Sequence, residues 1–124
     1  MNTNLKHILH DIPDTNLSVT DNGKLIKSNT GEEITSEVIR YKDKTIRVKT
    51  LILTIYKALD LQELYPTVTD VWYEFFNEET YSNYIDYSLV DFCKEQEINY
   101  KHARNCLYRG VTTKDGWSIK RKTN

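Results

Sequence analysis

The sequence has few of the residues from which catalytic and metal sites are usually built. Its four glycines are isolated from one another, so no glycine-rich phosphate-binding loop can be assembled. Its two cysteines, Cys93 and Cys106, are too few for a structural zinc site, and we expect both to be small core residues in a reducing compartment. No Ser-His-Asp or Cys-His arrangement can be defended, and we expect no cofactor.

Long apolar segments are also missing. No hydrophobic run approaches the roughly 20 residues that span a bilayer. Residues 1–11 lack the apolar stretch and cleavage site of a signal peptide. We therefore expect a cytoplasmic protein without membrane contact. At 124 residues, 39% of them hydrophobic and 28% charged, the chain suits one folded domain or a short domain with an appended module.

Charge is unevenly distributed along the chain, although the net charge is only −1. Residues 1–60 contain nine Lys and Arg against eight Asp and Glu. Residues 61–87 contain six acidic and no basic residues, whereas residues 88–124 contain eight basic and four acidic residues. This asymmetry points to different partners, or different faces, for the parts of the chain. We expect three parts: a β-meander with a helix in 1–60, an acidic aromatic connection in 61–87 and a basic helical module in 88–124.

The first part predicts an α+β fold. Turn signals at 21–23, 29–31 and 42–44 separate short β-prone segments. These segments cover residues 17–19, 24–27, 34–39 and 45–48, and they predict a small antiparallel meander. The period then changes, and residues 49–59 are expected to form an amphipathic helix packed on the sheet. The expected buried stripe of this helix is Leu51, Ile52, Ile55, Ala58 and Leu59.

The acidic middle part is harder to interpret. Residues 68–76 favour a helix, because their apolar side chains can share one face. The inward residues would be Val71, Trp72, Phe75 and Phe76. The outward acidic residues Asp70, Glu74, Glu78 and Glu79 could hold magnesium if they converged, but a solvated acidic face is the simpler interpretation. Tyr81, Tyr84 and Tyr87 follow at three-residue spacing, which extends the helical interpretation.

The third part has clear helix-boundary signals. Ser88 followed by Asp91 fits a capping box, and a helix over residues 89–95 is predicted. Residues 97–99 form a turn, Asn99 can cap a second helix over 100–108, and Gly110 ends that helix. A final strand is predicted over 116–120.

Two short helices in this order predict a helix-turn-helix, the arrangement in which one helix enters the major groove of DNA. The expected buried face is Leu89, Phe92, Cys93, Ile98, Ala103 and Leu107. The expected DNA-binding residues are Tyr100, Lys101, Arg104, Asn105, Tyr108 and Arg109, extended by Lys114, Lys120, Arg121 and Lys122. The alternative is a helical hairpin whose basic face meets only water.

Residues 91–108 (DFCKEQEINYKHARNCLY) and 114–120 (KDGWSIK) resemble the C-terminal helix-turn-helix module of phage HNH homing endonucleases. Residues 11–13, 17–19 and 21–25 are similar to the opening motif of the same family, and residues 41–56 resemble its strand-then-helix entry to the nuclease. The resemblance covers about two-thirds of the chain. It implies a phage-encoded protein that binds double-stranded DNA.

The chain departs from that family at the catalytic residues. The resemblance implies a histidine at the start of the helix, but Lys49 and Thr50 stand there. Residues 60–87 contain no histidine, and the three histidines are His7, His10 and His102. An HNH nuclease needs a histidine base and a divalent metal. We therefore expect a catalytically inactive relative that binds DNA; an active nuclease is a weaker alternative.

A second functional hypothesis assigns the acidic segment to protein binding. Its expected contact residues are Trp72, Tyr73, Glu74 and Phe76, because aromatic side chains are frequent interface anchors. Its partner would be a host protein, for example the transcription machinery. A helix-turn-helix of this size often acts as a homodimer or beside a second DNA contact, for which the strands before residue 48 are a candidate. His7 and His10 form a further pair that is expected to be exposed.

Overall fold

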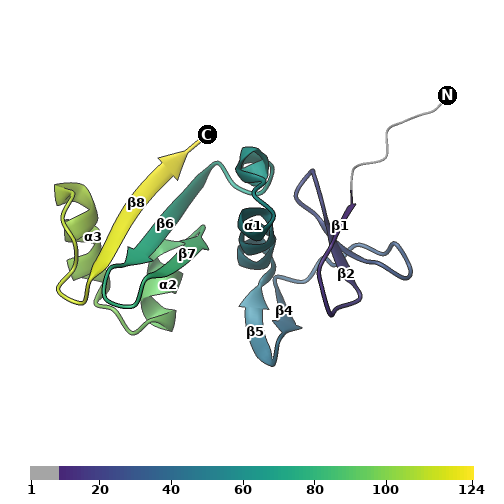
Figure 1. The fold of residues 1–124 in the computed structure, drawn as a ribbon, viewed down its shortest axis with the longest axis horizontal. Helices are drawn as coiled ribbons and strands as arrows, with labels where there is room; N and C mark the ends of the chain where they lie inside the picture. The colour runs from purple at the N-terminus through teal and green to yellow at the C-terminus, as the bar shows by residue number, and fades with distance from the viewer. Residues whose placement is uncertain (1–8) are drawn as a thin grey trace. The chain divides into compact units, whose positions relative to one another are not determined.

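The structure is a computed structural model that describes residues 9–124 (Figure 1). It is an α+β protein, as the sequence predicts, and its strands form three small antiparallel sheets. The chain divides into two compact units, Met1–Thr69 and Asp70–Asn124. Within the described residues, no helix is long and apolar enough to cross a membrane.

The first unit begins with a three-stranded sheet in the order β1-β2-β3, made of β1 (Leu9–Asp11), β2 (Leu17–Thr20) and β3 (Leu25–Lys27). The predicted turn at 21–23 connects β2 and β3, and Gly23 has the positive φ of 83° that this turn requires. Strand β1 precedes the first segment for which the sequence predicts a strand, residues 17–19.

A separate two-stranded hairpin follows, formed by β4 (Val38–Tyr41) and β5 (Lys44–Arg47). The prediction of one continuous meander is therefore wrong. Residues 34–37 lie outside the strands, although Ile34 N–H donates to the Leu25 carbonyl over 2.8 Å. Strand β4 starts only at Val38 and pairs with β5, so the chain leaves the first sheet before the hairpin begins.

Strand β5 continues directly into helix α1 (Val48–Ala58), and the 3-10 helix η1 (Gln62–Thr67) follows (Figure 1). The predicted helix is confirmed, but its buried face is shifted. Ala58 and Leu59 are exposed, whereas Tyr56 is buried. The Tyr56 hydroxyl donates to the Thr20 carbonyl and accepts the Gly23 N–H over 3.1 Å, so this polar tip joins α1 to the β2–β3 turn.

The second unit is built on a three-stranded antiparallel sheet in the order β7-β6-β8. Its strands are β6 (Val71–Asn77), β7 (Ser82–Asp86) and β8 (Trp117–Thr123). The predicted helix over 68–76 is wrong, and so is the helical interpretation of Tyr81, Tyr84 and Tyr87. Asn77 ends β6 by accepting the N–H groups of Glu79 and Thr80 over 2.9 and 3.1 Å, which closes the turn into β7.

Helices α2 (Leu89–Glu95) and α3 (Tyr100–Arg109) lie between β7 and β8 in the chain. The core cluster of the unit consists of Phe75, Leu89, Phe92, Cys93, Ala103, Trp117 and Ile119. Ile98 and Leu107 pack against it, so the predicted inner face of the two helices is confirmed. Cys93 and Cys106 are both buried free thiols, as expected. The module is not purely helical, because β8 returns to pair with β6 along its whole length.

Candidate nucleic-acid interface

Helix α3 is held at both ends by side-chain and backbone hydrogen bonds. The Asn99 side-chain oxygen accepts the His102 N–H over 2.9 Å and caps the start of α3. Gly110 ends the helix in the left-handed conformation, with φ of 67°, as Gly does at many helix ends. Ser88 caps α2 in the same way by accepting the Asp91 N–H over 3.2 Å. The predicted caps Ser88, Asn99 and Gly110 are therefore confirmed, but the Ser88 N–H donates to Asp86 Oδ1 over 3.0 Å, the role that the Asp91 carboxylate would fill in the predicted capping box.

The inner side of α3 fixes the helix against the core. Ala103 is fully buried, and a small side chain here lets α2 and α3 approach closely. Cys106 is also buried, one turn further along, and Leu107 packs against the core cluster. The turn between the helices is closed by the Ile98 N–H, which donates to the Cys93 carbonyl over 2.8 Å. The orientation of α3 is thus set by packing on one side only.

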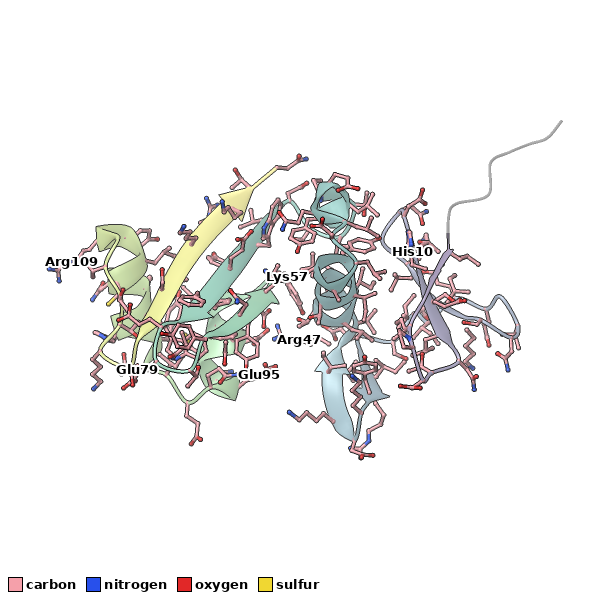
Figure 2. The ribbon with its side chains drawn as sticks, viewed as in Figure 1. His10, Arg47, Lys57, Glu79, Glu95 and Arg109 are labelled. Atoms are coloured by element: carbon pink, nitrogen blue, oxygen red, sulfur yellow. The ribbon has the colours of Figure 1, made fainter. Side chains whose placement is uncertain are left out.

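The outer side of α3 is free along the whole helix. Its six predicted DNA-binding residues are all exposed, and Tyr108 reaches 78% exposure. Residues four apart stack along a helix surface, so these six form two adjacent rows. The rows are Tyr100, Arg104 and Tyr108, and Lys101, Asn105 and Arg109. Figure 2 shows Arg109 pointing away from the sheet at the end of α3.

The charged side chains on this face are all positive, because α3 contains no acidic residue. It carries Lys101, Arg104 and Arg109, together with the amide of Asn105. The Arg104 guanidinium lies 5.8 Å from the centre of the Tyr100 ring. A cation–π contact at an exposed site contributes about 0.5–1 kcal/mol. It restrains the Arg104 side chain and leaves its N–H groups available to acceptors.

Lys114 lies close to α3, whereas two of the other predicted basic residues do not. The Lys114 N–H donates to His102 Nε2 over 3.3 Å, which ties its loop to α3, a contact that no sequence pattern indicated. In the strand register, Lys120 lies opposite Glu74 of β6 and Lys122 lies opposite Trp72. They therefore lie on the opposite face of the sheet from Phe75 and Ile119, which pack towards the helices. Arg121 pairs with Tyr73 and is exposed on the helix side.

The residues proposed for protein binding lie on β6, the central strand of the sheet. Trp72 is only 9% exposed, and its indole N–H donates to a Glu74 carboxylate oxygen over 3.2 Å. Tyr73 packs against the core cluster, and Glu74 and Phe76 are half-buried. Both backbone edges of β6 are paired, so the strand cannot add a further partner strand.

No metal centre is formed by the part of the chain that the structure describes: residues 9–124 contain no group of three or more His, Cys, Asp or Glu able to hold an ion. His10 is half-buried on β1 rather than exposed as expected, and His7 lies outside the described residues. Burial raises the pKa of the Cys93 thiol, which favours its uncharged form over the thiolate that binds metals.

Comparisons of this chain with protein-family models, curated proteins and solved structures find no match. The exposed basic face of α3, and the core that orients it, are therefore the observations from which a function can be inferred.

Proposed function

We propose that this protein binds double-stranded DNA by placing α3 in the major groove, with α2 crossing behind it. The observation that carries the proposal is the outward face of α3, which is exposed, basic and free of carboxylates along two rows of side chains. The major groove is wide enough for one α-helix, and the N-terminal half of a recognition helix contacts the base edges. Here Lys101, Arg104 and Asn105 lie within the first six residues of α3.

The chemistry of these side chains divides their roles. Arg104 can donate two hydrogen bonds to a guanine edge, and Asn105 can pair with adenine. Lys101 and Lys114 suit phosphate oxygens, because an ammonium is a compact point charge with three donors. Tyr100 and Tyr108 can contact phosphate or a thymine methyl group. Selectivity for particular sequences is thus assigned to Arg104 and Asn105.

We further propose that the chain binds DNA without cutting it, as an inactive relative of phage HNH homing endonucleases. Lys49, rather than histidine, stands in the first turn of α1, where that resemblance implies the catalytic base. Plasmid DNA incubated with the protein and magnesium or manganese is expected to stay supercoiled; metal-dependent nicking would contradict this part of the proposal.

The test is a fluorescence-anisotropy titration of a duplex DNA at several salt concentrations. Arg104→Ala is expected to weaken binding by about 1–3 kcal/mol. Lys101→Ala is expected to lower the slope of log affinity against log salt by about 1, because one phosphate contact is lost. Selection of tight binders from a random duplex pool would show a changed base preference for Asn105→Ala.

The matched control is Lys120→Ala/Lys122→Ala, which changes the charge of the same unit on the opposite face of its sheet. This double variant is expected to weaken binding less than Lys101→Ala/Arg104→Ala. Equal losses would mean that total charge, and not the α3 face, determines affinity. Wild-type protein that binds no duplex at low salt would refute the proposal outright.

A further inference from the structure

The hairpin β4–β5 in the first unit carries a concentration of exposed positive charge. Arg40, Lys42 and Lys44 are all exposed, and they lie within five consecutive residues around the turn. The hairpin forms a sheet of only two strands, which projects from the N-terminal end of α1 (Figure 1). Residues 40 and 42–45 are exposed, so side chains on both faces of the hairpin near its tip are accessible to a ligand.

These three charges have no acidic partner among residues 9–124. The lysines of the preceding sheet differ, since Lys24 lies 3.4 Å from Glu33 and Lys27 lies 3.3 Å from Glu32. At the hairpin tip, the only acidic residue is Asp43, which is exposed and forms no ion pair within the described part of the chain. Lys42 instead places its ammonium 5.3 Å from the centre of the Tyr41 ring.

The strand register distributes the charges over several directions. Arg40 pairs with Thr45, and Lys44 pairs with Tyr41, so Arg40 and Lys44 lie on opposite faces of the hairpin. Lys42 occupies the turn between the strands, with φ of 50°. A small anion needs donors that converge on one point. Charges that diverge around a narrow ribbon instead suit a polyanion whose phosphates lie on both sides of it, as they do along a DNA groove.

We propose that the β4–β5 hairpin is a second DNA-binding surface, which contacts phosphate groups through Arg40, Lys42 and Lys44. A two-stranded ribbon fits the major groove of B-DNA, and lysine and arginine neutralise phosphates without reading sequence. The inference rests on the proposed function for the identity of the polyanion, but it concerns a different unit and different residues. Its role is to add sequence-independent affinity.

The experiment compares two double variants of the full-length chain that remove the same charge from the same unit. Lys42→Ala/Lys44→Ala is expected to lower the slope of log affinity against log salt by about 2, because two phosphate contacts are lost. The control Lys24→Ala/Lys27→Ala removes two lysines that are already paired with carboxylates, and it is expected to leave the slope nearly unchanged. Lys42→Arg/Lys44→Arg keeps the charge and should retain the wild-type slope.

Equal slopes for the two double variants would overturn the inference, because only overall charge would then matter. So would a hairpin variant that binds DNA normally but no longer binds vesicles rich in phosphatidylserine, since the ligand would then be a lipid surface. The proposed function fails separately. If the hairpin variant lowers DNA affinity while Lys101→Ala/Arg104→Ala does not, the hairpin inference stands and the assignment to α3 falls. Thermal unfolding of each variant is the control for folding, and these exposed substitutions are expected to leave the melting temperature nearly unchanged.

Discussion

The two basic surfaces of this protein are supported in different ways. Beneath α3 lies a core of fully or almost fully buried side chains, including Phe75, Phe92 and Ala103. Beneath the β4–β5 hairpin, Ile39 and Ile46 face each other across the strands and are only half-buried. A two-stranded hairpin by itself is marginally stable. A surface fixed by a core can hold side chains in register with base edges, whereas a weakly supported hairpin suits contacts that need charge but little positional precision.

Core substitutions should give the largest difference between the two surfaces. The Phe92 ring stacks on Phe75 with 3.6 Å between centroids and meets Trp117 edge-on at 5.2 Å. Phe92→Ala is expected to lower the free energy of unfolding of the second unit by about 3–5 kcal/mol and to abolish binding through α3. Both tryptophans, Trp72 and Trp117, belong to this unit, so urea denaturation followed by tryptophan fluorescence measures its stability.

The matched substitution in the hairpin is Ile46→Ala. Because Ile46 is only half-buried, its truncation should cost about 1 kcal/mol. Hydrogen exchange of the α1 amides follows the first unit, which contains no tryptophan. If Ile46→Ala destabilised its unit as strongly as Phe92→Ala does, the hairpin would have to be regarded as supported by a core, and the contrast between the surfaces would disappear.

Alkaline pH should produce a smaller difference in stability between the two units. Burial raises the pKa of Tyr56 in the first unit, an effect that hydrogen bonds from Thr67 and Gly23 oppose and the charge of Asp21 reinforces. Burial likewise raises the pKa of Cys93 in the second unit. In both cases the unfolded chain releases its proton first, so stability is complete below the unfolded pKa and falls as pH rises towards the folded one. Free thiols titrate near about 8.5 and phenols near about 10, so the second unit should weaken first.

The measurement is the urea midpoint of each unit between pH 8 and pH 10.5. Cys93→Ala should flatten the pH dependence of the tryptophan signal, and Tyr56→Phe should flatten that of the α1 amides. Each variant is expected to leave the other unit's pH dependence unchanged. A fall in stability that persists in the second unit of Cys93→Ala would assign its alkaline sensitivity to other groups.

The elements that could be predicted from the sequence are those whose signals are local. The boundaries of α2 and α3 follow from Ser88, Asn99 and Gly110, each of which acts on backbone groups within a few residues. The exposure of Lys101 and Arg104 follows from helical period alone. These signals indicate which side chains face outwards, but not which distant strands share a sheet.

Strand β6 could not be predicted because its apolar spacing is ambiguous. Trp72, Phe75 and Phe76 can share a helix face, yet the same aromatic residues favour a strand when a partner is present. The partners of β6 are β7 and β8, and β8 follows α3 in the chain. The register of β6 and β8 decides that Lys120 and Lys122 face away from the helices. The turn residue Asn77 was the available local signal for a hairpin. The charge of the β4–β5 hairpin was visible in the sequence, but its isolation from the first sheet was not.

The smallest expected effect concerns Asp43 at the tip of the hairpin. Asp43 has φ of 63°, a conformation that asparagine tolerates as well as aspartate, so Asp43→Asn should change stability by less than about 0.5 kcal/mol. The substitution removes the only acidic group of the tip, and it is therefore expected to raise DNA affinity about twofold at low salt. Asp14→Asn is a closely matched control, because Asp14 is exposed, has the same φ of 63° and lies in the same unit. An equal rise in both variants would show that the hairpin has no special role, whereas a rise confined to Asp43→Asn would place phosphate within reach of the tip.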